Sequence, residues 1–318
     1  MIEKQLKKIR KKQICVLGDV MLDIFSYGSI NRISPEAPVP VLDIEQENGH
    51  LGGALNVCNN LISLGAGTEI IGVSGDDFEA FRLESLCEQA GINKQGLIRD
   101  HDRVTTCKTR YFDKEEPLFR VDREQRTAIS GKIEKKLETE VQRALRRADA
   151  CILQDYNKGV MTPGLIKSTL SYAKKLDVPV FVDPKFENVE YYAGAFFIKP
   201  NLREAESIIN RKIGDVEDAQ AAAEELFRKL SAQHILLTMG SEGMILKSAD
   251  QNLYIPAHYI EMADITGAGD TVIAALSAFH SIGLSPAESA KNANLAAARV
   301  CSFPGVSAVS KKMLLQDR

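Results

Sequence analysis

The segment from Asp264 to Thr271 has the residue types needed to bind an anion beside a general base. Its centre is Gly267-Ala268-Gly269, followed by Asp270 and then by apolar residues at helical spacing. The small residues therefore lie at a helix N-terminus, where backbone N–H groups lack partners and the helix dipole favours negative charge. This arrangement suits phosphoryl transfer, with Asp270 taking the proton of an attacking hydroxyl. Taken alone, the segment is better explained as a tight turn with an ordinary first-turn aspartate.

The elements that must position this segment alternate between strands and helices. Short apolar runs predict strands at 14–17, 68–73, 150–154, 178–182, 195–198, 235–238 and 244–247. Helical patterns lie at about 2–10, 54–64, 77–90, 131–147, 163–176, from 202 and 218, 268–282 and 286–301. This alternation predicts an α/β fold with a mainly parallel central sheet flanked by helices. No internal repeat or long linker divides the chain, so we expect a single domain over residues 1–318.

Two segments depart from this alternation. Residues 29–53 contain three prolines, which exclude a helix or a central strand, and residues 105–122 have the pattern of a hairpin. We expect these segments, roughly 24–50 and 104–122, to form a small β-sheet lid. Its apolar residues, such as Val39 and Ile44, would be exposed in a monomer, so we expect a homodimer through the lid.

Polar residues gather where the predicted strands end. The pairs are Asp19 and Asp23, Asp155 and Lys158, Asp183 and Lys185, Asn201 and Glu204, and Thr238 and Gly240. Ligands of open α/β sheets bind at that edge. A single strand-end aspartate is often only a turn former or a helix cap, but five strand ends together favour a site.

Composition restricts the class of partner. The 318 residues are 44% hydrophobic and 26% charged, with a formal net charge of −3, which gives no support for nucleic-acid or membrane binding. Six cysteines without a Cys-x-x-Cys pair indicate reduced thiols. The first apolar run has four residues, too few for a signal peptide, and no segment reaches the ~18 apolar residues of a membrane span. We therefore expect a soluble, cytoplasmic protein.

Three motifs together resemble a known family. Residues 264–270 resemble the C-terminal signature of the ribokinase-like (PfkB) carbohydrate kinases, and Gly52-Gly53-Ala54-Leu55-Asn56 resembles their N-terminal signature. Asn201-Leu-Arg-Glu204 is similar to their Asn-x-x-Glu motif. The resemblance implies a ribokinase-like fold and ATP-dependent phosphorylation of a sugar hydroxyl. It also implies Mg²⁺ and a stimulating monovalent cation such as K⁺.

Four further stretches resemble one branch of this family, the D-glycero-β-D-manno-heptose 7-phosphate kinases. They are residues 18–23, 32–40, 155–159 and 182–185. The likeness implies phosphorylation of the anomeric hydroxyl to give the heptose 1,7-bisphosphate, a precursor in ADP-heptose and lipopolysaccharide core biosynthesis. In some bacteria this kinase is fused to a nucleotidyltransferase. Because the sequence ends soon after Ser310, we expect that second activity to be absent.

The resemblance implies roles for individual residues. Asp270 would be the base, and Gly267, Ala268 and Gly269 would form the anion hole. Asn201 and Glu204 would orient the phosphates and Mg²⁺ through water, while Asp264 and Thr266 would hold the monovalent cation. The nucleotide would contact Lys185, Thr238, Gly240, Gly243 and Asn294. The sugar would contact Asp23, Gly52, Gly53, Asn56 and Asp155.

A sugar that already carries a phosphate needs a second anion site. The candidates are Lys108, Arg110, Arg120, Arg123 and Lys158. Arg110 and Lys158 are favoured, and a solvated face of the lid is the alternative for the hairpin cations. Closure of the lid would exclude water from ATP and the base before transfer.

Two alternative functions stay open from the sequence. The acceptor could be another sugar or sugar phosphate, or the protein could be a non-catalytic sugar- or nucleotide-sensing member of the same fold. The intact Asp270 and its glycines argue against the second. A panel of acceptors would separate the first from the heptose kinase.

Overall fold

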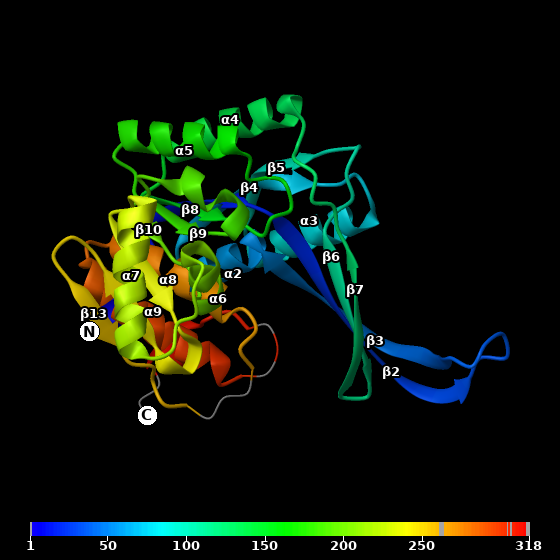
Figure 1. Ribbon diagram of the computed structural model, residues 1–318. Coiled ribbons are helices and arrows are strands. Elements are labelled where there is room, and N and C mark those ends of the chain that lie inside the picture. Colours follow the sequence, from blue (N-terminus) through cyan, green and yellow to red (C-terminus); the bar gives the residue numbers. More distant parts are fainter. Residues whose placement is uncertain (1, 261–263, 304, 306, 316–318) are drawn as a thin grey trace.

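A nine-stranded sheet forms the centre of the computed structural model, which describes residues 2–260, 264–303, 305 and 307–315 (Figure 1). Its order within these residues is β13-β12-β11-β10-β9-β8-β1-β4-β5. The strands are β1 (Gln13–Gly18), β4 (Gly67–Ser74), β5 (Asn93–Arg99), β8 (Ala150–Gln154), β9 (Val180–Asp183), β10 (Phe197–Ile198), β11 (His234–Thr238), β12 (Met244–Lys247) and β13 (Asn252–Ile255).

The seven strands β5, β4, β1, β8, β9, β10 and β11 pair in parallel, whereas β12 pairs antiparallel with both of its neighbours, β11 and β13. The expected mainly parallel sheet is therefore confirmed. The strand order reverses between β1 and β8, whose carboxyl ends are Gly18 and Gln154. In open α/β sheets the crevice at such a reversal is the usual ligand site.

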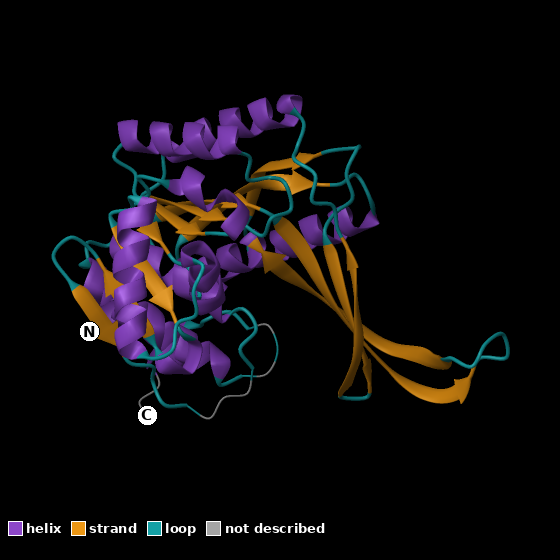
Figure 2. Ribbon diagram, in the orientation of Figure 1, coloured by secondary structure: helices purple, strands orange, loops and turns teal. Residues whose placement is uncertain are grey.

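Helices cover both faces of this sheet (Figure 2). They are α1 (Ile2–Ile9), α2 (Ala54–Leu64), α3 (Phe78–Ala90), α4 (Gly131–Leu145), α5 (Pro163–Lys175), α6 (Leu202–Ile209), α7 (Val216–Leu230), α8 (Ala268–Ser281), α9 (Pro286–Cys301) and α10 (Lys311–Leu315), with the 3₁₀ helices η1 (Phe186–Tyr192) and η2 (Gly240–Glu242). Side chains of β1 alternate between two buried clusters: Ile14 and Val16 pack with α2, α8 and α9, whereas Cys15 and Leu17 pack with α4, α5 and α7.

A second, four-stranded sheet projects from the main body (Figure 1). It consists of β2 (Val20–Ile33), β3 (Pro40–Gly53), β6 (Cys107–Asp113) and β7 (Glu116–Arg123), in the order β3-β2-β6-β7; we call it the small sheet. Only Asp19 separates β1 from β2, and Gly53 leads directly into α2. The small sheet is therefore joined directly to β1, at the crevice, through β2 and to α2 through β3.

The small sheet has one apolar face near the main body. Leu22, Ile24 and Cys107 form a buried cluster against Leu86 of α3. Side chains alternate along a strand, so Asp23 and its register partner Lys108 lie on the opposite face.

Three elements differ from the sequence prediction. Strand β5 was not predicted because its first residues are polar and it lies at the edge of the sheet, and β13 lies at the other edge. Strand β2 begins at Val20, whereas the first lid segment was expected from about residue 24. The six cysteines are buried and free, as expected.

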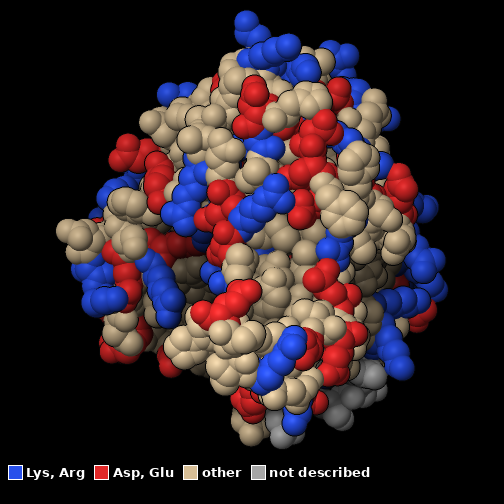
Figure 3. Space-filling view, turned by 90° about the vertical axis from the view of Figure 1, so that its right-hand side faces the viewer, with Lys and Arg blue, Asp and Glu red and all other residues tan. Residues whose placement is uncertain are grey.

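Within the described residues, no helix combines the length and the hydrophobicity that crossing a membrane requires. Figure 3 views the side from which the small sheet projects, and basic and acidic side chains intermix over this face. This face therefore lacks the extended basic patch that typifies nucleic-acid-binding surfaces.

Candidate active site

Asp270 lies in the first turn of α8, buried beneath the crevice with 6% of its surface exposed. Its Oδ2 accepts a hydrogen bond from Asn56 Nδ2 at 2.7 Å. Its Oδ1 accepts two, from the Tyr156 hydroxyl at 2.7 Å and from Gln154 Nε2 at 3.1 Å. Oδ1 is thus occupied by two donors, whereas Oδ2 retains capacity for one more proton donor.

Burial raises the pKa of Asp270 from 3.8 to about 6. The loss of solvation is the largest cause, and Asp183 acts in the same direction. Hydrogen bonds from Asn56 and Tyr156 and the charge of Lys199 oppose this rise. A carboxylate with this pKa is ionised at neutral pH and can still accept a proton, as a general base must.

The glycines before α8 allow other groups to approach Asp270 closely. Gly267 is the N-cap with φ 80°, and a Cβ there would lie 2.9 Å from Asn56 Nδ2. A Cβ on Gly269 would lie 3.6 Å from Lys199 Nζ, which is buried and pairs with Asp183 at 3.0 Å. First-turn amides and a lysine therefore flank the space beside Asp270, an arrangement suited to an anion.

The loop after β8 delivers Tyr156 to the base. Asp19, at the end of β1, accepts hydrogen bonds from the backbone N–H groups of Tyr156, Lys158 and Val160 at 2.8, 3.1 and 3.2 Å. Burial raises the pKa of Asp19 to about 6, with Asp155 contributing. Asp19 thus fastens the loop to the central strand. Tyr156 lies in one of the stretches that resemble the heptose 7-phosphate kinases, but no role was predicted for it, and no motif pointed to Gln154.

Asp155, which the resemblance places among the sugar contacts, faces a different part of the loop. Its carboxylate accepts hydrogen bonds from the Asn157 amide, the Asn188 side chain and the Tyr192 hydroxyl. It is 1% exposed. Both carboxylate oxygens of Asp155 are therefore engaged by its own loop and by η1.

The candidate sugar ligands on the small sheet do lie together. Asp23 Oδ1 accepts a hydrogen bond from Arg110 Nη1 at 2.7 Å. A Cβ on Gly52 would lie 2.1 Å from Asp23 Oδ2. Gly53 has φ 58°, and a Cβ there would lie 2.5 Å from the Asp19 carbonyl oxygen. Both glycines are therefore required by the close approach of the chain around β2 to the end of β3, which places Asp23 beside Gly52, two residues before α2 begins.

Asn201 and Glu204 form a capping box at the N-terminus of α6. The Asn201 side chain accepts from the Glu204 amide, and Glu204 Oε2 accepts from the Asn201 amide, both at 2.9 Å. Glu204 Oε1 pairs with Lys185 Nζ. Burial lowers the pKa of Lys185, but the Glu204 carboxylate outweighs this, and the net change is a rise. Lys185 Nζ also lies 5.6 Å from the ring centroid of Tyr156, which links this cap to Asp270.

The candidate nucleotide contacts surround the end of β11. Thr238 pairs with Asn201 in an isolated bridge, and Gly240 opens η2 with φ 61°. A Cβ on Gly243 would lie 2.2 Å from the Ile255 carbonyl oxygen, so this glycine is needed for the contact with β13. Asn294 of α9 donates to the Pro256 carbonyl at 2.7 Å. Gly243 and Asn294 thus have structural partners of their own.

Asp264 is held by the backbone around it. Its Oδ1 accepts from the Thr266 amide at 2.8 Å and its Oδ2 from the Gly305 amide at 3.1 Å. Burial raises the pKa of Asp264, but these hydrogen bonds outweigh burial and lower it overall. The group is therefore ionised at neutral pH.

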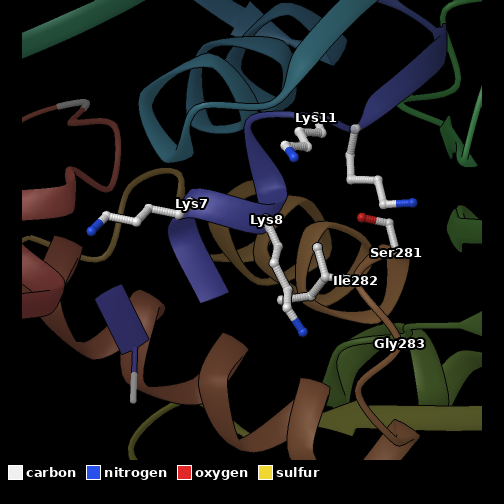
Figure 4. A pocket seen from close by; sticks show the side chains of 7 residues that line it. Lys7, Lys8, Lys11, Ser281, Ile282 and Gly283 are labelled. Carbon is white, nitrogen blue, oxygen red and sulfur yellow. The ribbon is translucent and has the colours of Figure 1, made fainter. Parts of the chain in front are cut away.

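A hollow of about 510 Å³ lies at the opposite end of α8 from Asp270. It is lined by Lys7, Lys8, Lys11, Lys12, Ser281, Ile282 and Gly283 (Figure 4). The labelled lysine side chains point in different directions, and Lys12 pairs with Asp149 at 2.7 Å. The ammonium groups do not converge on one point, so this hollow lacks the geometry of an anion site.

Comparison with known sequences identifies the family. The model of the pfkB family carbohydrate kinases matches residues 11–313. The chain belongs to this family. It is 38% identical over 310 residues to the bifunctional protein HldE of Pelobacter propionicus, covering 97% of this chain and 64% of that protein. It is 40% identical over 306 residues to HldE of Caulobacter vibrioides, covering 94% and 62%. The chain thus spans less than two thirds of these relatives.

Solved structures of the family share the fold. Phosphofructokinase-2 of Escherichia coli in complex with substrates and products superposes with a TM-score of 0.80 at 18% identity, covering 95% of this chain and 97% of that one. The ribokinase of Arabidopsis thaliana in complex with ribose and ATP gives a TM-score of 0.73 at 18% identity, covering 96% and 99%. The ribokinase-like fold expected from the motifs is therefore confirmed.

Proposed function

We propose that this carbohydrate kinase transfers the γ-phosphoryl group of ATP to the anomeric hydroxyl of D-glycero-β-D-manno-heptose 7-phosphate. The observation that carries the kinase chemistry is the buried carboxylate of Asp270, which lies in the first turn of α8 behind Gly267 and Gly269. The acceptor is supported by the four stretches that resemble heptose 7-phosphate kinases and by 37–40% identity to several HldE proteins.

In this proposal the acceptor hydroxyl donates its proton to Asp270 Oδ2. Oδ1 already accepts from Tyr156 and Gln154, so Oδ2 has the remaining capacity. The amides of Gly267, Ala268 and Gly269 would stabilise the negative charge on the transferred phosphoryl group. Lys199, 3.6 Å from the position of a Gly269 Cβ, adds a fixed positive charge on the same side.

The nucleotide would lie between the start of α6 and the end of β11. Lys185, Asn201, Thr238 and Gly240 border this region, and we keep Gly243 and Asn294 as its outer wall. Lys185 is the side chain best placed to meet the phosphates, because it stands between Glu204 and the Tyr156 ring.

The residues present fit a magnesium ion held mainly by nucleotide phosphates and water. Among the described residues no group of three histidine, cysteine or acidic side chains converges, and Mg²⁺ bound to nucleotides often uses few protein ligands. Glu204 would hold it through water, because both its oxygens already have protein donors. Bound Mg²⁺ would neutralise charge on the phosphates. The ionised Asp264, with Thr266, suits a monovalent cation such as K⁺.

The sugar would bind on the small sheet, between Asp23, Gly52, Gly53 and Asn56. The small sheet would act as a lid that excludes water from the site. Its outer residues include exposed apolar side chains, among them Val39, Ile44, Phe119 and Val121. Pairing of two small sheets in a homodimer would cover them.

An acceptor panel tests the proposal directly. ADP release would be measured with heptose 7-phosphate, unphosphorylated heptose, fructose 6-phosphate and ribose, each with Mg-ATP, with and without K⁺. We expect kcat/KM to be highest for heptose 7-phosphate, by at least tenfold. If kcat/KM were higher for another acceptor, that acceptor would take the place of heptose 7-phosphate as the proposed substrate. No turnover with any acceptor would refute the kinase assignment.

A further inference from the structure

Three cations surround one carboxylate where β7 leaves the small sheet. Glu124 Oε2 pairs with Lys158 Nζ at 2.7 Å and with Lys108 Nζ at 3.2 Å, and its Oε1 pairs with Arg126 at 3.0 Å. The side chains of Lys158, Lys108 and Glu124 are only 10%, 15% and 13% exposed. Burial raises the pKa of Glu124, but these donors outweigh it and lower the pKa to about 2. The carboxylate is a fully ionised anion held by its neighbours.

The charges of this network do not balance. Lys108 also pairs with Asp122 at 3.0 Å, and Asp122 pairs with Arg120 at 2.7 Å. The network of four cations and two carboxylates therefore has a net charge of +2. A sugar phosphate carries about −1.5 to −2 at neutral pH, so this excess of positive charge attracts it.

The network faces the candidate sugar site. Lys108 is the register partner of Asp23 on β2, and both lie on the charged face of the small sheet, away from α3. Lys158 lies in the same loop as Tyr156, which donates to Asp270. The cluster therefore borders the space between the small sheet and the loop, with Asp23 on one side and the base on the other.

Two other basic residues of the small sheet, Arg110 and Arg123, pair with different carboxylates. Arg110 pairs with Asp23 at 2.7 Å and lies against the Phe25 ring, so it neutralises a candidate sugar ligand. Arg123 pairs with Glu79 at 2.8 Å. Glu124 pairs with three basic side chains, Lys108, Lys158 and Arg126, whereas Asp122 pairs with two, Lys108 and Arg120.

We propose that Lys108, Lys158 and Arg126 form the subsite for the phosphate that the acceptor sugar already carries. Glu124 occupies this subsite in the absence of substrate and is displaced by the phosphate. A phosphate has three oxygens for the three cations, whereas Glu124 offers two, so the exchange improves the hydrogen bonding. A neutral sugar cannot displace Glu124, and the subsite thereby selects phosphorylated acceptors. This inference rests on the proposed function.

The first test compares two acceptors that differ only in the phosphate. Lys158→Met should raise KM for heptose 7-phosphate by roughly 10- to 100-fold, since it removes a charged hydrogen bond. Its KM for unphosphorylated heptose and for ATP should change less than twofold, and Lys158→Arg should restore most of the loss. Lys94→Met is the matched control, because Lys94 is likewise a lysine paired with carboxylates but lies on β5. Equal effects of Lys158→Met on both acceptors, or no effect, would overturn the subsite.

Glu124→Gln should change the KM for heptose 7-phosphate in the opposite direction. Removal of the competing charge should lower KM for heptose 7-phosphate by roughly two- to fivefold, the range expected for one partly exposed ion pair. A purely structural ion-pair network predicts the reverse, because loss of Glu124 would leave the lysines unpaired and loosen the site. A rise in KM would therefore overturn the displacement of Glu124.

Binding of inorganic phosphate tests the subsite without depending on which sugar is the acceptor. Its binding would be measured by calorimetry on the full chain, with a non-hydrolysable ATP analogue saturating the nucleotide site. We expect Lys158→Met to weaken phosphate binding at least tenfold and Glu124→Gln to strengthen it. If heptose 7-phosphate is not turned over but phosphate binding follows this order, the proposed function fails and the subsite stands. Equal binding by the wild type and both variants overturns the subsite.

Discussion

Replacing Asp270 with asparagine should make the protein more stable and nearly inactive. The folded protein holds this carboxylate at a pKa of about 6, against an ordinary value of 3.8. Each pKa unit corresponds to about 1.4 kcal/mol, so ionising Asp270 in the folded state costs up to about 3 kcal/mol at neutral pH. Asparagine carries no charge to desolvate. It can keep the hydrogen bonds at Oδ1, and the Asn56 amide, whose oxygen is buried without a partner, can turn to accept from the new amide.

The sign of the pH dependence follows from the raised pKa. The folded protein binds this proton more tightly than the unfolded chain does. The stabilising contribution of the protonated group is therefore present in full below about pH 4 and is lost as the pH rises through about 6. The difference between Asp270→Asn and the wild type should be near zero at pH 4 and largest above pH 7.

Thermal unfolding and turnover should be measured on the same preparations. At pH 7.5 the melting temperature of Asp270→Asn should exceed that of the wild type by roughly 2–6 °C, taking about 2 °C per kcal/mol for a chain of this size. Its kcat should fall by roughly 10² or more, while ATP binding is retained. A variant less stable than the wild type at pH 7.5, or one with near-normal kcat, would refute the account of Asp270 as a strained base.

Three further substitutions test neighbouring contacts. Tyr156→Phe removes a donor to the base, so the acidic limb of the pH profile of kcat/KM should move up by about one unit; an unmoved limb would exclude this hydrogen bond from catalysis. Gly52→Ala places a Cβ 2.1 Å from Asp23 Oδ2 and should raise the sugar KM roughly tenfold, with little change in the ATP KM; an unchanged sugar KM would remove Asp23 from the sugar site. Glu204→Ala should raise the Mg-ATP KM and lower the free energy of unfolding by about 1 kcal/mol, because it removes the helix cap. Glu204→Gln keeps the cap and should change only the KM. Equal losses of stability in the two variants would show that the cap depends on the charge.

Most of the main sheet was predictable because its strands are buried on both faces. Ile14–Leu17 is continuously apolar, and its alternate side chains enter two separate cores, so the run could not be an amphipathic surface element. Strand β5 escaped prediction for the opposite reason. It begins Asn93-Lys94-Gln95 and pairs on one side only, so its pairing with β4, rather than its own pattern, makes it a strand.

Only those residues of the site that belong to recognised motifs could be predicted from the sequence. Asn56 and Asp270 are 214 residues apart, and their motifs brought both to attention before the fold joined them. Gln154 belongs to no recognised signature, and Tyr156 lies in a recognised stretch, 155–159, that implied no role for it. Their contact with Asp270 depends on how β8 meets α8. One signal was available: Gln154 is a polar residue closing an otherwise apolar strand, which favours a specific hydrogen-bonding role at a strand end.

The central claim is that the amides before α8 hold the terminal phosphate of ATP while Asp270 deprotonates the sugar. A crystal structure with a non-hydrolysable ATP analogue and heptose 7-phosphate would test it most directly. We expect the γ-phosphate at the backbone N–H groups of Gly267–Gly269 and the anomeric oxygen within hydrogen-bonding distance of Asp270 Oδ2. A γ-phosphate remote from α8, or a different side chain bonded to the anomeric oxygen, would contradict the account.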